Sequence, residues 1–231
     1  MAFLLFALMF VSENPTWPFD HELVDAAVAY QVHGKGLMAK KMVFKTEAGE
    51  EIQCGFGWVR RSTDTNQGLF NKADAGTRTK TAFSIKNGFD GLKWTVRSLS
   101  QSEMVQTSFG ALEESSTTVA LSSENMAEPG FLTLKVGAED LMVGHWNRRG
   151  IRVAELTANR RLPLFDSPFS SGQTTGYFAV YLDGRQVGGL IVPKGLRQDY
   201  SVYLQDGLSE ADRGLVVTLL LMITRVGTLA G

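Results

Sequence analysis

The sequence predicts a mostly-β protein, either a barrel or a sandwich, with a buried hydrophobic helix at the carboxyl end. Two observations lead to this fold class. From Leu37 onward, short runs of alternating apolar and polar residues are separated by stretches of Ser, Thr, Asn and Gly, without the long helices of βαβ units. Near the end, the segment from Ser209 to Arg225 changes to helical spacing and has no polar face along its centre.

The composition fits an ordinary globular protein that carries no overall charge to attract a polyanion. The chain has 231 residues, 44% of them hydrophobic, which is enough to build a sizeable core. Its 23 Lys and Arg residues balance 24 Asp and Glu residues, so no nucleic-acid partner is expected, and an anionic ligand would need a local patch. The single cysteine, Cys54, excludes an internal disulfide and a cysteine-based zinc site, and it suits a reducing compartment.

The amino terminus is an uninterrupted apolar segment. Met1 to Val11 contain no polar residue, but this run is shorter than the 20 or so residues (about 30 Å of helix) that span a bilayer. No Lys or Arg precedes Lys35, so a standard secretory signal is not predicted. A docked apolar segment, an atypical membrane-targeting segment and a misplaced start codon all stay open. The expected location is cytoplasmic or peripheral membrane.

A linker and a short helix follow this segment. Asn14 to Asp20 hold two prolines and predict an extended turn. His21 to Gln31 have apolar residues at helical spacing, and the glycines at 34 and 36 would end the helix. The chain is therefore expected to divide into an amino-terminal segment, residues 1–36, and a β-domain with a carboxyl-terminal helix, residues 37–231.

The clearest strand signal is the hairpin within Gly176 to Val192. Asp183 and Gly184 at its centre are typical of a type I′ turn, because both central positions of that turn need positive φ. Seven further strands are expected at residues 41–45, 51–61, 92–99, 117–122, 131–136, 151–156 and 199–204.

The closing helix carries its own start signal. Ser209 is placed to accept a hydrogen bond from an orphan backbone N–H, and Asp212 sits at the third helical position. Leu215 to Ile223 are then apolar apart from Thr218. Burying each large apolar side chain contributes about 1.5–3 kcal/mol, so this helix is expected to be enclosed by protein. It is short for a membrane span.

A many-stranded β-domain that ends in a hydrophobic helix resembles the tubby-like superfamily, which includes the phospholipid scramblase-related and LURP-one-related proteins. The residues that carry the resemblance are the hairpin from Tyr177 to Val192, the strand from Asp199 to Leu204 and the run from Gly207 to Arg225. The resemblance implies a closed antiparallel β-barrel around the carboxyl-terminal helix, and a membrane-proximal or ligand-binding role. The chain lacks the scramblases' Pro-rich leader, cysteine cluster and acidic calcium-binding segment, so scrambling activity does not carry over.

No catalytic residue, metal site or cofactor is predicted from sequence motifs. No nucleophile elbow of the GxSxG type is present, and no metal-ligand spacing joins the three histidines, His21, His33 and His145. The paired glycines that begin at Gly55 and Gly188 form no phosphate loop, and on strands they indicate bulges or close packing.

Arginine pairs are the more informative feature, and two of them follow a Trp-x-Arg-Arg pattern. Arginine binds phosphate through paired hydrogen bonds and tryptophan favours the membrane interface, so an anionic headgroup site is one interpretation. The other is solvated charge at strand edges. Adjacent arginines on a strand point to opposite faces, so a pair is not by itself a patch. The candidate ligand-binding residues are Trp58, Arg60, Arg61, Trp146, Arg148, Arg149, Arg160 and Arg161.

The leading functional hypothesis is a non-enzymatic, tubby-like or scramblase-like module that acts at membranes or binds an anionic lipid or ligand. The alternative is a structural or interaction subunit of an assembly, with a sandwich or jelly-roll fold and an oligomeric state. A hydrolase without a recognisable motif comes third. The position of the terminal helix separates the first two, because a barrel encloses it and an assembly places it at an interface.

Overall fold

The structure is a computed structural model, and it describes residues 19–33, 40–66, 76–107, 110–124, 128–135, 138–156, 176–192 and 200–225. The prediction for Met1 to Val11 lies outside these residues. The helices and strands are α1 (His21–Ala26), β1 (Ala27–His33), β2 (Lys41–Lys45), β3 (Glu51–Phe56), β4 (Arg60–Asn66), β5 (Gly76–Lys86), β6 (Lys93–Thr107), β7 (Gly110–Ser123), β8 (Gly130–Leu134), β9 (Asp140–Trp146), β10 (Arg149–Glu155), β11 (Gly176–Leu182), β12 (Arg185–Val192), β13 (Tyr200–Gln205) and α2 (Glu210–Ile223).

All the strands belong to one antiparallel sheet that closes on itself. The order runs from β3 through β2, β1 and β13, and then back in descending order to β5 and β4. A short pairing between β3 and β5, at Gly55–Lys86 and Phe56–Ile85, completes the ring. Every strand except β4 takes part in this ring. The predicted closed antiparallel β-barrel is therefore confirmed.

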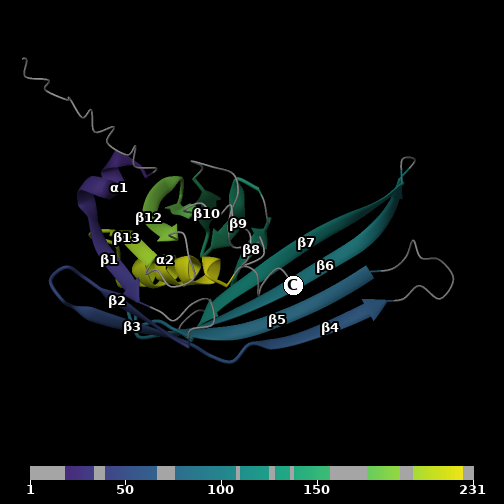
Figure 1. Cartoon of the computed structure of the whole chain (residues 1–231), viewed down its shortest axis with the longest axis horizontal. Coiled ribbons are helices and arrows are strands. Elements are labelled where there is room, and N and C mark those ends of the chain that lie inside the picture. The colour runs from purple at the N-terminus through teal and green to yellow at the C-terminus, as the bar shows by residue number, and fades with distance from the viewer. Residues whose placement is uncertain are drawn as a thin grey trace, which may run out of the picture.

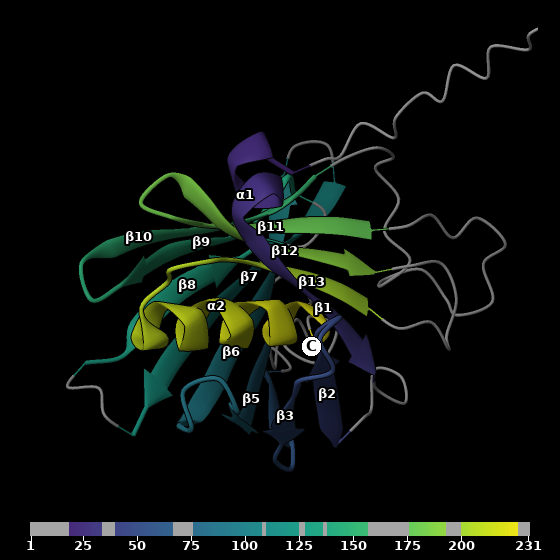
Figure 2. The same ribbon diagram turned by 90° about the vertical axis from the view of Figure 1, so that its left-hand side faces the viewer.

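Helix α2 runs through the inside of the barrel, with strands around it in both views (Figures 1 and 2). Its amino end is capped as expected, because the Ser209 hydroxyl accepts a 3.1 Å hydrogen bond from the backbone N–H of Asp212. The ten residues from Gly214 to Ile223 are all buried. On the facing strand β12, a Cβ at Gly188 would lie 2.6 Å from a methyl group of Val216. Enclosure of the helix and close packing at this glycine are both confirmed.

The amino-terminal helix is shorter than the sequence pattern predicts. It ends at Ala26, and the chain continues as β1, which pairs with β13 and with β2. The prediction of helix as far as Gln31 is wrong in its second half, where Tyr30 and Val32 alternate as buried strand residues. Before the helix, the Phe19 ring packs on the outer face of β12, where a Cβ at Gly189 would lie 2.8 Å from it.

The remaining strands differ from expectation mainly in length and number. Asp183 and Gly184 have φ values of 52° and 82°, which confirms the positive-φ turn between β11 and β12. Strands β6 and β7 have 15 and 14 residues, much longer than predicted, and β5 and β9 were not predicted at all. Together with β4 and β5, the long strands extend beyond the barrel as a curved arm (Figure 1).

Candidate functional site

The candidate site lies where the barrel ends and the arm begins. Both β3 and β4 pair with the same edge of β5: β3 at its carboxyl end, and β4 from Arg60–Ala82 onward. The two strands therefore act as one interrupted strand, and residues 57–59 form the interruption. The backbone N–H of Gly57 still donates to the carbonyl of Ser84, 2.8 Å away, which holds this three-residue loop against the sheet.

The tip of this loop exposes two large apolar side chains. Trp58 is 82% exposed and Val59 is 44% exposed. The Lys40 ammonium group lies 4.6 Å from the centre of the Trp58 ring, within range of a cation–π interaction. An indole left in water next to lysine is an arrangement suited to an interface that is apolar on one side and charged on the other.

A row of lysines crosses the outer wall next to the loop. Lys41 of β2 pairs with Gly55 of β3, Gly55 with Lys86 of β5, and Lys86 with Lys93 of β6. All three lysines are exposed. Like charges in directly opposite positions destabilise a sheet, so this register has a cost that a bound anion would offset. Gly55 has no side chain to fill the middle of the row.

Two adjoining cavities connect the lysines to the loop. The larger, of about 570 Å³, lies over the lysine row and is bordered by one acidic residue, Glu124. The smaller, of about 290 Å³, lies under Trp58 and Val59, between the loop and the barrel end. Both cavities are lined by Lys40, Phe56 and Gly57. We call Lys40, Lys41, Trp58, Val59, Lys86 and Lys93 the Trp58 surface.

Arg225, just after α2, is a further lining residue of the smaller cavity. Its guanidinium group lies 4.4 Å from the centre of the Phe56 ring. Burial lowers the pKa of Arg225 from its usual value, and the nearby Tyr200 opposes this shift. Phe56 and Phe83 supply apolar walls, with ring centres 6.5 Å apart. The cavity thus combines apolar walls with cationic groups, which fits the apolar and anionic parts of an amphipathic molecule.

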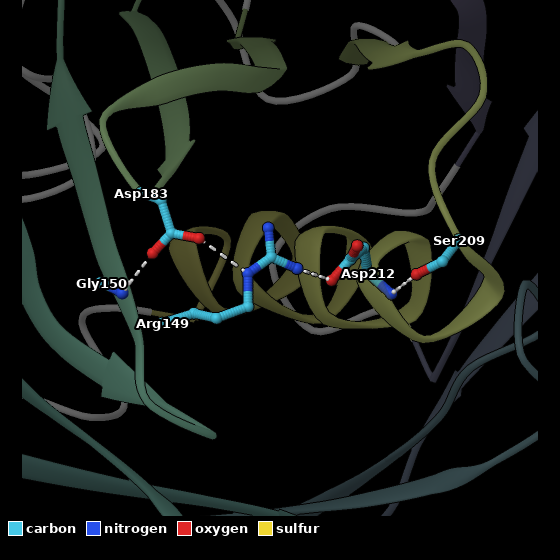
Figure 3. A network of polar contacts seen from close by, with 5 residues as sticks. All are labelled: Arg149, Gly150, Asp183, Ser209 and Asp212. Carbon is cyan, nitrogen blue, oxygen red and sulfur yellow. Dashed lines mark hydrogen bonds and ion pairs between the residues drawn. The ribbon is translucent and has the colours of Figure 1, made fainter.

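The two predicted Trp-x-Arg-Arg motifs lie at opposite ends of α2. Phe56, two residues before Trp58, contacts Arg225 at the carboxyl end, whereas Arg149 forms an ion pair with Asp212 in the first turn (Figure 3). The length of the helix, roughly 20 Å at 1.5 Å per residue, separates these contacts. The motifs therefore do not combine into one site.

In the second motif, Trp146 and Arg149 contact other parts of the barrel. Trp146 is only 8% exposed, and its ring packs 6.3 Å from that of Trp94. Arg149 donates a 2.9 Å hydrogen bond to Asp183 as well as pairing with Asp212 (Figure 3). Arg148 is exposed in the turn between β9 and β10, with a φ of 65°.

The first motif divides between the two faces of the arm. Arg60 pairs with Ala82 and Arg61 with the buried Thr81, so their side chains leave opposite faces of β4, as the strand pattern predicts. Both arginines are exposed. Arg160 and Arg161 lie outside the described residues. Within the part of the chain that the structure describes, no group of three His, Cys, Asp or Glu side chains could hold a metal ion.

No family model, curated protein or solved structure matches this chain. In the described residues, neither helix is long and apolar enough to cross a membrane.

The lysines of the Trp58 surface were missed by sequence reasoning. They are spread over 54 positions, from Lys40 to Lys93, and each is an ordinary strand-end lysine in its local sequence. Only the pairing of β2, β3, β5 and β6 brings them together. The Lys40-Lys41 doublet before β2 was the one local signal.

Proposed function

We propose that this protein is a non-enzymatic module, of the tubby-like or scramblase-related type, that attaches to anionic membranes through the Trp58 surface. The observation that carries the proposal is the 82% exposed Trp58 next to four lysines. Three of these lysines lie on β2, β5 and β6, and the fourth, Lys40, directly precedes β2. Trp58 and Val59 would enter the interfacial region of the bilayer, and the lysines would contact the headgroups.

Electrostatic attraction would supply much of the affinity of this surface for anionic membranes. Each Lys or Arg near an anionic membrane contributes on the order of 1 kcal/mol, so four lysines contribute about 4 kcal/mol, a factor of roughly a thousand in affinity. The chain as a whole has a formal charge of −1, so attraction comes from this local patch and not from net charge. Binding should weaken as salt rises, because exposed charges are screened beyond about 10 Å at 0.1 M.

Vesicle flotation of the full chain tests the proposal. Wild-type protein should float with vesicles of phosphatidylcholine containing 30% phosphatidylserine, and much less with phosphatidylcholine alone, in low salt. Lys86→Glu/Lys93→Glu should lower the bound fraction at limiting lipid at least about tenfold, because two attractive charges become repulsive. Trp58→Ala should lower it several-fold on the same vesicles.

Two control variants make the same kinds of substitution at positions outside the Trp58 surface. Phe131→Ala removes an exposed aromatic ring from the outer wall of β8, and Lys135→Glu/Arg185→Glu makes the same change of net charge elsewhere. Both controls should float like wild type. The proposal fails if wild type shows no preference for anionic vesicles, or if the controls lose as much binding as the variants of the Trp58 surface.

A further inference from the structure

Strand β4 forms one border of the arm; among the described residues, the part of β7 before Thr117 forms the other. Strand β4 pairs with β5 over its whole length, from Arg60–Ala82 to Asn66–Gly76. Among the described residues, no strand pairs with its other side. The strand lies along the outer border of the arm, away from the barrel (Figure 1). An open edge of this kind presents a row of backbone N–H and C=O groups to another strand.

The side chains of β4 leave that edge accessible. Arg60 through Asp64 are exposed on both faces, so the strand contributes nothing to the hydrophobic core at these positions. The strand has no proline, which would block pairing. A partner would therefore have to be recognised by backbone hydrogen bonds and by the order of charges along the strand.

That order is self-complementary. Two copies of β4 related by a two-fold axis normal to the sheet pair antiparallel, and with Ser62 on the axis each Arg60 lies opposite Asp64 of the other copy. Residues that face each other in this register point to the same side of the sheet. On the other face, Arg61 lies opposite Thr63, so the register contains two ion pairs and no pair of like charges.

The neighbouring registers are worse. With Arg61 on the axis, two guanidinium groups face each other, and with Asp64 on the axis, two carboxylates do. With Thr63 on the axis there are no ion pairs. From this we infer that β4 is a homodimerisation edge, and that a second copy of this chain adds its own β4 antiparallel to it with Ser62 at the two-fold axis.

The row of charges extends into the arm of each copy. Within one chain, Asp64 already lies opposite Arg78 of β5. In the dimer, Asp64 is flanked by Arg78 on one side and by the second copy's Arg60 on the other, so the signs alternate across the joined sheets. The axis is normal to the sheet, and it therefore keeps equivalent loops on the same face. Both Trp58 loops would point to one side of the dimer.

Disulfide trapping of the full chain tests the pairing. Directly opposite residues in antiparallel strands have Cα atoms about 4.5–5.5 Å apart, within the range of about 4.4–6.8 Å that a disulfide needs. Ser62→Cys should therefore form a reducible covalent dimer under mild oxidation. The native Cys54 is buried, and burial raises its pKa to about 11, so it does not compete. Lys80→Cys, opposite Ser62 on β5 but one strand further from the axis, is the control.

Dimer formation by Ser62→Cys should be at least tenfold faster than by Lys80→Cys. In the Ser62→Cys background, Arg60→Asp should slow trapping about tenfold. The substitution replaces both ion pairs of the dimer with pairs of carboxylates, because each position 60 lies opposite Asp64 of the other copy. Adding Asp64→Arg should restore part of the rate, because the two ion pairs across the axis re-form with exchanged partners, while the new side chain is repelled by Arg78 within its own chain. Equal rates for Ser62→Cys and Lys80→Cys would overturn the inference, and so would a charge exchange that fails to restore trapping.

Discussion

The side-chain amide of Asn87 donates a 2.8 Å hydrogen bond to the backbone carbonyl of Gly214, inside the barrel. The same amide donates to the Thr218 hydroxyl at 3.1 Å, and its oxygen accepts from the backbone N–H of Phe89 at 2.9 Å. Asn87 is completely buried. One amide therefore fastens the turn between β5 and β6 to the enclosed helix, using its donors and its acceptor together.

Asn87→Ala should lower the free energy of unfolding by about 2–3 kcal/mol, because it takes the amide donor from the buried Thr218 hydroxyl and Gly214 carbonyl and the acceptor from the half-buried N–H of Phe89. Urea denaturation measures the change. Gln53→Ala, which removes an exposed amide from β3, should change stability by less than about 0.5 kcal/mol. A loss for Asn87→Ala no larger than for this control would contradict the role of the amide.

Gly214→Ala should also destabilise the protein, against the usual trend. Replacing a helical glycine with alanine commonly stabilises by about 1 kcal/mol. Here a Cβ at Gly214 would lie 1.8 Å from a carboxylate oxygen of Asp90, which accepts a 2.8 Å hydrogen bond from the Trp94 indole. The displaced carboxylate would lose that bond. A midpoint of denaturation at or above that of wild type would show that the turn adjusts without cost.

Leu219→Asp should prevent folding altogether. Leu219 is completely buried in the middle of α2, so the variant loses about 2–3 kcal/mol of apolar burial and places a carboxylate in the core at a further cost of several kcal/mol. That sum is comparable to the total stability of a domain, about 5–15 kcal/mol. Ala211→Asp, an exposed position in the first turn of the same helix, should fold normally. Soluble expression and cooperative melting monitored by circular dichroism distinguish the two variants. A Leu219→Asp protein that melts cooperatively would contradict the enclosure.

The Arg149–Asp183 contact should make stability depend on pH. The hydrogen bond from Arg149, followed by one of 2.8 Å from the backbone N–H of Gly150, lowers the pKa of Asp183 below its usual 3.8. A carboxyl with a depressed folded-state pKa stabilises the protein above its unfolded-state pKa, and this contribution is lost as pH falls through the folded value.

Asp183→Asn isolates this charge, because asparagine also accepts the positive φ of the turn. Urea midpoints should be lower for the variant than for wild type at pH 6–7, and the difference should shrink as pH falls below about 4. Added salt should reduce the difference at neutral pH, since Asp183 is exposed to solvent. A difference that stays constant from pH 7 to pH 3 would mean that the ion pair contributes nothing.

Local signals explain which parts of the fold were predictable. The cap at Ser209, the apolar run of α2 and the Asp183-Gly184 turn each depend on a few neighbouring residues, and all three are present in the structure. Strand β1 was missed because Ala27 to Gln31 fit helical spacing as well as alternation. Pairing with β13 and β2, which the local sequence does not contain, selects the strand.

The two Trp-x-Arg-Arg motifs show what the sequence alone could not predict, namely which tryptophan is exposed. By itself the sequence determined a mostly-β domain, barrel or sandwich, with a capped apolar helix at its carboxyl end, because periodicity, turn residues and caps act over short distances. Closure into a barrel depends on the pairing of β3 with β5. Only the tertiary structure decided that Trp58 is 82% exposed and Trp146 is 8% exposed. The same pattern has two outcomes because one tryptophan ends in an exposed loop between β3 and β4, whereas the other packs against Trp94, which is distant in sequence. The lysines next to Trp58 depend in the same way on strand register, which long-range pairing sets.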